Sequence, residues 1–167
     1  MIKVYDFIRG KEVKIISIAV LLTLVFVLLV LVFDTEDLSL VGRIVNTSIL
    51  VLVFAIAWGS CPKRMVVTSD NLIIVKNFGR SIVIPRYRIK SVESVEYKQL
   101  KLIRTFGNGG LFGYTGRYSS RTLGKIRMLA TERDNLVCIK TDSECYVVSC
   151  RRRDDFVSTV GSMIVKR

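Results

Sequence analysis

Two long runs without a charged residue constrain this chain more than any other feature of its sequence. The first covers residues 15–33 and the second residues 44–61, and both are dominated by Leu, Val and Ile. A helix rises about 1.5 Å per residue, so the first run extends about 28 Å, close to the thickness of a bilayer's hydrocarbon core. We therefore predict two transmembrane helices, at 15–33 and 44–61.

Two alternatives fit these runs less well. A cleaved signal peptide would have a shorter apolar stretch followed by small residues, whereas the chain continues after Phe33 as Asp34-Thr35-Glu36-Asp37. A buried core helix is the other alternative for both runs, but the first run is apolar on every side, so it is not an amphipathic surface helix. Trp58, near the end of the second run, stands where an aromatic ring meets the membrane–water interface.

The flanking charges predict the orientation. Residues 1–14 carry a net charge of +2 and residues 34–43 a net charge of −2, while residues 61–167 carry +12. Positive flanks stay in the cytoplasm. We expect a multi-pass protein of the cytoplasmic (inner) membrane, with a cytoplasmic N-terminus at 1–14, a short external loop at 34–43 and a cytoplasmic domain at 62–167. Cys138, Cys145 and Cys150 would then remain reduced thiols.

The part of the chain from residue 62 onward predicts a mainly β domain. Short apolar runs alternate with turn formers such as Ser69-Asp70-Asn71, which indicates about seven strands in a bent antiparallel sheet or barrel. At the end, Phe156, Val160, Met163 and Ile164 recur at helical spacing. The fold class is therefore a membrane α-hairpin followed by a β domain that a C-terminal helix caps.

Several short motifs resemble the bacterial PH (pleckstrin-homology-like) domain families, in which a pair of transmembrane helices often precedes the domain. The resemblance covers about residues 62–165 and rests on these motifs: Leu72-Ile73-Ile74, Ile84-Pro85-x-Tyr87-x-Ile89-x-x-Val92, Arg104-Thr105-Phe106-Gly107, Gly110-Leu111-Phe112-Gly113-Tyr114-x-Gly116, and Ser149 with Asp154-x-Phe156. It implies a membrane-attached PH-like fold and supplies no catalytic residue. The loop Ser69-Asp70-Asn71 does not match the basic loop of phosphoinositide-binding PH domains.

The composition argues against an enzyme. The chain has no histidine, which excludes Ser-His-Asp and Cys-His catalysis and His-ligated zinc. Its glycine-rich segment fails the GxGxxG pattern, because Phe112 stands where the third glycine belongs. We expect no catalytic residue, no metal, no cofactor and no small-molecule substrate. The basic charge could favour nucleic acid, but two membrane spans and the lack of a recognition motif oppose that partner.

The candidate binding residues fall in two groups. Residues 106–124 hold six of the eleven glycines, which either serve turns and close backbone contacts or carry an interface loop of Leu111, Phe112 and Tyr114 that contacts the bilayer or a partner subunit. The second group is basic, and it forms either a solvated face or a binding site for anionic lipid or a partner. Its members are Arg151, Arg152, Arg153, Arg104, Arg117 and Arg121. The preferred patch within this group is 151–153.

These features together predict an integral membrane protein that works by binding. The first hypothesis is a protein-interaction or assembly module at the cytoplasmic membrane face, with a protein partner or a second copy of the chain. The alternative is a sensor of the anionic membrane surface, whose partners are membrane lipids.

Overall fold

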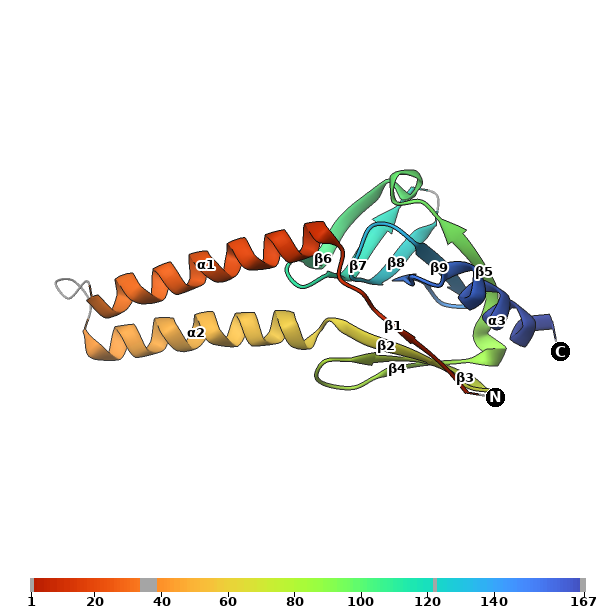
Figure 1. The fold of residues 1–167 in the computed structure, drawn as a ribbon, viewed down its shortest axis with the longest axis horizontal. Coiled ribbons are helices and arrows are strands. Elements are labelled where there is room, and N and C mark those ends of the chain that lie inside the picture. Colours follow the sequence, from red (N-terminus) through yellow and green to blue (C-terminus); the bar gives the residue numbers. More distant parts are fainter. Residues whose placement is uncertain (1, 34–38, 122, 166–167) are drawn as a thin grey trace.

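Two long helices project side by side from a β domain (Figure 1). The computed structural model describes residues 2–33, 39–121 and 123–165. Helix α1 covers Lys11–Phe33 and helix α2 covers Leu40–Gly59. Both are long and apolar enough, by length and composition, to cross a membrane. Of the predicted external loop at 34–43, residues 34–38 lie outside the described residues. Helix α2 already begins at Leu40, within the predicted loop. Ser39 caps this helix, because its side chain accepts a hydrogen bond from the Gly42 amide.

The β domain contains two sheets. The four-stranded sheet has the order β1-β2-β3-β4 and the six-stranded sheet the order β5-β9-β10-β8-β7-β6. Short 3₁₀ turns η1 (Arg86–Arg88) and η2 (Tyr97–Leu100) flank β5, and helix α3 (Arg153–Val165) ends the described chain. The strands are β1 (Lys3–Asp6), β2 (Pro62–Val67), β3 (Asn71–Lys76), β4 (Ile82–Pro85), β5 (Ile89–Val95), β6 (Leu102–Gly109), β7 (Tyr114–Ser120), β8 (Gly124–Ala130), β9 (Leu136–Thr141) and β10 (Cys145–Ser149).

The predicted fold class is confirmed, with three more strands than the sequence indicated. Strands β6 and β7 occupy the glycine-rich segment, and β1 comes from the N-terminus, before the first helix. Strand β1 pairs antiparallel with β2, so Tyr5 lies opposite Met65. One pairing departs from the antiparallel expectation: β10 lies between β9 and β8 and runs parallel to β8.

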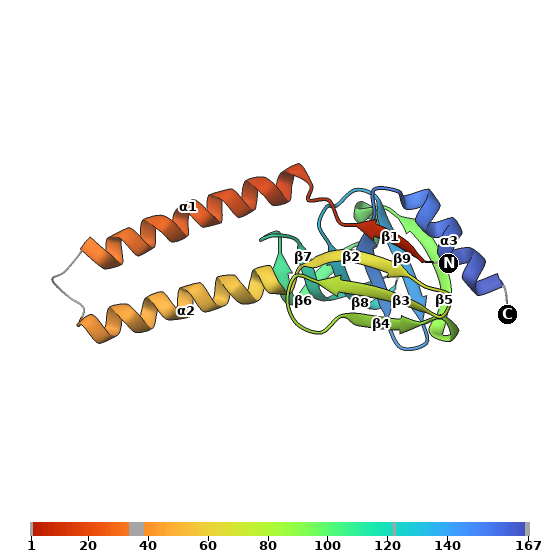
Figure 2. The same ribbon diagram turned by 60° about the horizontal axis from the view of Figure 1, so that its bottom comes forward.

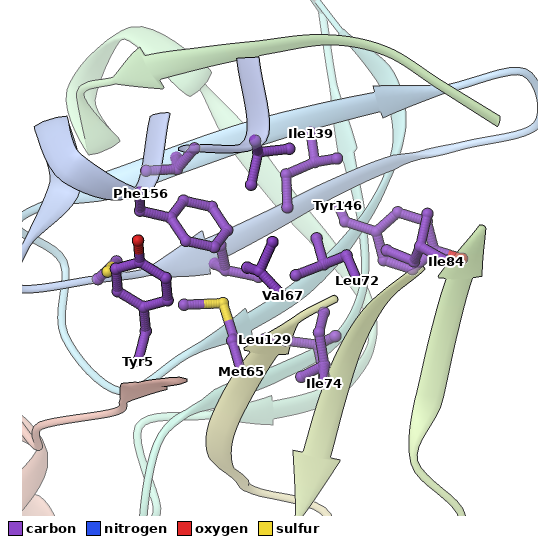
Figure 3. Packing of buried hydrophobic residues seen from close by; sticks show 14 of the residues in the cluster. Tyr5, Met65, Val67, Leu72, Ile74, Ile84, Leu129, Ile139, Tyr146 and Phe156 are labelled. Carbon is purple, nitrogen blue, oxygen red and sulfur yellow. The ribbon is translucent and has the colours of Figure 1, made fainter. Parts of the chain in front are cut away.

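The main core lies between the two sheets and under α3. In Figure 2, β2, β3 and β4 lie in front of the six-stranded sheet, and α3 stands at the end remote from the long helices. Figure 3 shows Tyr5, Met65 and Phe156 packed together, with the Tyr5 and Phe156 rings edge to face and their centres 5.1 Å apart. Phe156 and Val160, two members of the predicted helical stripe, are completely buried.

The central strands β9 and β10 of the six-stranded sheet are buried on both faces, because residues along them alternate between two clusters. In β9, Val137 and Ile139 belong to the main core, whereas Leu136 and Cys138 belong to a second cluster with Tyr114 and other residues of the sheet. Period-two alternation of this kind assigns every second side chain to each face.

Two cysteines of the second cluster are joined. Cys138 on β9 and Cys145 on β10 form a disulfide, with their Cα atoms 6.6 Å apart. The expectation of reduced thiols is therefore wrong for this pair, because the hairpin places both side chains on one face of adjacent strands. Cys150, the third predicted thiol, is free and buried.

Candidate functional site: the helix-facing end of the domain

The helix-facing end of the domain is where the two long helices join it, and three chain segments meet there. They are the N-terminal connection at residues 7–10, the turn between β3 and β4 at residues 77–80, and the loop between β6 and β7 at residues 110–113. Both views place the 110–113 loop between the domain ends of α1 and α2 (Figures 1 and 2).

Helix α1 is fixed to the domain by its first residues. The Gly10 amide donates to the Thr131 carbonyl at 2.9 Å, and the Thr131 hydroxyl donates to the Ile8 carbonyl at 2.8 Å. Val13, in the first turns of α1, is completely buried in the second cluster. The connection between α1 and the domain is therefore held by hydrogen bonds and packing and is not a free linker.

Arg133 forms a second attachment to α1. Its guanidinium lies 4.9 Å from the centre of the Tyr97 ring and 5.0 Å from that of Tyr114, and 3.3 Å from the Glu12 carboxylate. The Tyr114 hydroxyl also reaches Glu12, at 3.4 Å, and burial raises the pKa of this phenol. Tyr114, which was predicted to lie in a loop that contacts the bilayer or a partner subunit, is a buried core residue that supports this attachment.

The 110–113 loop forms a wedge between the helices. The Phe112 ring packs edge to face on Phe54 of α2, with ring centres 5.1 Å apart, and its amide donates to the Ser17 hydroxyl of α1 at 2.9 Å. Phe112 has a φ of 60°, in the left-handed region that few residues other than glycine adopt. A Cβ at Gly110, which also has positive φ, would come within 3.0 Å of Ile16.

Leu111 completes the wedge. Its carbonyl accepts a hydrogen bond from the Asn108 side chain and a weaker one, at 3.9 Å, from the Cys61 thiol. Leu111 and Phe112 are both half-buried against the helices of their own chain. The predicted interface loop thus has an intramolecular partner for two of its three residues.

The turn at 77–80 fixes the end of α2. The Phe78 amide donates to the Gly59 carbonyl at 3.0 Å, and the Asn77 side chain donates to the Trp58 carbonyl at the same distance. Phe78 itself is 79% exposed, Phe106 on β6 is 78% exposed, and Trp58 is 47% exposed. Three aromatic rings are therefore open to the surroundings near the end of α2. Among them, only Trp58 has a sequence signal for an interface, because it stands near the end of an uncharged run.

The predicted patch Arg151, Arg152 and Arg153 is divided by its own contacts. The Arg152 guanidinium donates to the Val4 carbonyl at 3.0 Å and lies over the Tyr5 ring, so it packs on β1. Arg153 contacts the neighbouring Asp154 at 3.4 Å. Arg151 lines a hollow beside the start of α1, together with residues such as Arg9 and Arg133.

The other predicted cations lie on or beside strands β6 and β7. Arg104 and Arg117 are exposed on β6 and β7, in positions that the sheet brings close together. Arg121 follows the end of β7 that is opposite the 110–113 loop, so it is remote from the helices. The register sets Arg104 opposite Tyr118 and Arg117 opposite Phe106, so these two arginines belong to different faces of the sheet, and the six predicted arginines do not form one patch.

Two cross-strand glycines explain much of the glycine-rich segment. Gly107 on β6 lies opposite Gly116 on β7, and both have positive φ. A Cβ at either position would come within 2.2 Å of a backbone oxygen of the other strand, so only glycine fits. These two glycines serve a close backbone contact.

Among the described residues, no group of three or more Cys, Asp or Glu side chains is placed to hold a metal. The absence of enzymatic activity stays a prediction.

The architecture defines a PH-like β domain attached to a pair of apolar helices. A family model described as Bacterial PH domain matches residues 63–164, and the chain belongs to this family. The resemblance seen in the sequence is thereby confirmed. No curated protein matches the chain, and no solved structure does.

Proposed function

We propose that this protein spans the cytoplasmic membrane twice and uses its bacterial PH domain to bind the anionic lipid surface on the cytoplasmic side. The observation that carries the proposal is the group of exposed rings, Trp58, Phe78 and Phe106, near the end of an apolar helix. Aromatic and apolar side chains beside cations are typical of a membrane interface.

The surfaces of the helices support the membrane part of the proposal. Leu22, Phe26 and Leu29 of α1 and Leu52 and Ile56 of α2 are examples of large apolar side chains that are exposed in the isolated chain. Exposed apolar area on this scale requires a nonaqueous environment or a partner. A bilayer provides that environment along both helices.

Strand β1 supports a hairpin arrangement of the helices. It precedes α1 and pairs with β2, which follows α2. This pairing requires both segments to be on one side of the membrane, as two complete spans achieve. The charges of the flanking segments favour the cytoplasm for that side, whereas the disulfide between Cys138 and Cys145 favours an oxidising compartment. We place the domain in the cytoplasm because the charge difference extends over the whole chain.

Lipid binding is better supported than protein assembly. The assembly hypothesis depended on Leu111, Phe112 and Tyr114, which contact their own chain or its core. Phe78, by contrast, is free of such burial, and it precedes Arg80 in the same exposed turn. Each cation near an anionic leaflet contributes about 1 kcal/mol to binding.

Hydrogen exchange on the full chain in lipid nanodiscs tests the proposal. The isolated 62–167 fragment would lack β1 and leave the edge of β2 open, so it is unsuitable. We expect stronger protection of residues 77–80 and 104–108 in nanodiscs with phosphatidylglycerol than in nanodiscs of phosphatidylcholine alone, and the difference should shrink at high salt.

A matched pair of variants sharpens this test. The double change Phe78→Ser and Arg80→Gln should remove the lipid-dependent protection. The change Tyr87→Ser with Arg88→Gln removes a similar ring and cation at the opposite end of the β3–β4 hairpin, and it should have no effect. Equal protection in both kinds of nanodisc would refute anionic-surface binding, and a contact that persists at high salt in neutral nanodiscs would favour the assembly hypothesis.

A further inference from the structure

An amphipathic groove lies between the last turns of α2 and the domain. It has a volume of about 500 Å³ and is open on one side. Its helix wall includes Val53, Ile56 and Ala57, while Lys76 of β3 and Arg127 of β8 line it from the domain. The groove thus joins an apolar helix surface to two cations.

The strand register adds a third cation beside the groove. Phe106, Arg117 and Arg127 are directly opposite one another on β6, β7 and β8, so they form one row on one face of the sheet. Like charges at directly opposed positions destabilise a sheet. The pairing of Arg117 with Arg127 therefore leaves a concentration of positive charge at the edge of the groove.

This charge is poorly neutralised within the protein. Arg127 has an ion pair with Glu144, but the two groups are 3.7 Å apart, and Glu144 also accepts a hydrogen bond from Tyr146 at 2.7 Å. Within residues 2–33, 39–121 and 123–165, no carboxylate lies within 4.0 Å of the Lys76 ammonium. Partial burial and the nearby Arg127 both lower the pKa of Lys76. The negative charge of an anion in the groove would favour the charged form of Lys76 and so oppose both effects.

We propose that this groove binds one anionic phospholipid, with its phosphate held by Lys76 and Arg127 and an acyl chain lying along Val53 and Ile56. The apolar wall distinguishes a lipid from free phosphate, because a phosphate ion would leave that wall uncovered. Phe106, exposed on the same row as Arg127, lies where it can cover the glycerol region. The inference rests on the proposed function to the extent that α2 lies in a membrane.

Lipid retention by the full chain in detergent tests this site. Dioleoylphosphatidylglycerol, dioleoylphosphatidylcholine and inorganic phosphate are added separately, and native mass spectrometry counts the bound molecules. We expect one retained phosphatidylglycerol per chain. Phosphatidylcholine should be retained at least about tenfold less because its choline cation offsets the charge of its phosphate, and inorganic phosphate about tenfold less or weaker because it leaves the apolar wall uncovered. Equal retention of the two lipids, or binding of phosphate alone as strong as that of the anionic lipid, would overturn the proposal.

Three variants separate the site from general charge. Lys76→Gln with Arg127→Gln should reduce phosphatidylglycerol retention by about tenfold or more. Ala57→Phe should reduce it without changing any charge, because the new ring fills the groove. Lys98→Gln with Arg121→Gln removes two cations outside the groove and should leave retention unchanged. Unchanged phosphatidylglycerol retention in both groove variants would refute the site. If the Lys98 and Arg121 control also lost retention, the binding would be a general effect of positive charge and the groove site would be wrong.

The two proposals can fail separately. If the groove retains no lipid in detergent while residues 77–80 are still protected in anionic nanodiscs, surface binding stands and the groove site is wrong. If one lipid is retained per chain but the protection of residues 77–80 is the same in both kinds of nanodisc, the groove site stands and surface binding is wrong. Hydrogen exchange at the buried strands β9 and β10 shows whether the domain of each variant is folded, and Ala57→Phe provides a result that does not depend on the Arg127 ion pair.

Discussion

Removal of the Tyr5 side chain is the most direct test of whether the N-terminal strand belongs to the domain. Tyr5 is completely buried, its ring packs on Phe156, and its hydroxyl donates to the Asp155 carboxylate at 2.9 Å. Truncation of a buried aromatic residue to Ala costs about 3–5 kcal/mol, and we expect Tyr5→Ala to destabilise the domain by that amount. Tyr5→Phe keeps the ring and should cost about 0.5–1.5 kcal/mol, the net value of a hydrogen bond.

The measurement is native-state hydrogen exchange of the full chain in detergent, read at the buried strands β9 and β10. These strands report the free energy of opening of the β domain, whereas a circular dichroism signal would be dominated by α1 and α2. Val4→Ala is the control, because Val4 is in the same strand but its side chain is exposed, and it should change stability by no more than about 0.5 kcal/mol.

The result that would refute the reasoning is a Tyr5→Ala variant as stable as Val4→Ala. In that case β1 would not be part of the cooperative core, and its pairing with β2 would not constrain the topology of the helices. A loss confined to β1 and β2, with β9 and β10 unaffected, would mean that the four-stranded sheet opens independently of the rest.

Three further predictions concern pH, the wedge and the orientation. Hydrogen bonds from Lys3 and Tyr5 lower the pKa of Asp155 in the folded state. The stabilising effect of this carboxylate is therefore complete above the ordinary aspartate pKa, and it is lost as pH falls through the lowered value. Asp155→Asn should remove this acid-dependent loss of stability in thermal melts. Tyr114→Ser should destabilise the domain by about 3–5 kcal/mol, whereas Phe112→Ser should leave it folded and increase amide exchange only in the 110–113 loop, and similar losses in both would place Phe112 in the core. In intact cells, an impermeant maleimide should label Ser39→Cys but not Ser143→Cys, and the opposite pattern would put the domain outside.

The features that were predictable from sequence have local signals. The long helices follow from uncharged runs, and α3 follows from apolar residues at helical spacing, such as Phe156 and Val160. Strand β1 has no such signal, because it is four residues long and its partner β2 is remote in the sequence. Strands β6 and β7 contain polar residues and glycines, and only their pairing stabilises them as strands.

The candidate site was less predictable than the fold, for a related reason. Leu111 and Phe112 have the apolar character of an interface, but their composition does not reveal that the surface they contact is their own helix pair. Lys76 and Arg127 belong to different sheets, and neither stands in a distinctive motif. Their common position depends on strand register and on the placement of α2, which no local pattern encodes.

The pairing of β1 with β2 has a consequence for how the protein is made. The ribosome synthesises β1 first, yet its partner strand appears only after both helices have been made. During that interval the core that buries Tyr5 has not yet formed, and β1 is an unpaired segment. If the hairpin inserts with a single span, β1 and β2 are on opposite sides of the membrane and the core lacks Tyr5. Under the proposed two-span arrangement, completion of the domain would report correct insertion, and a chain with wrong topology would expose an open strand edge that quality-control proteases can recognise.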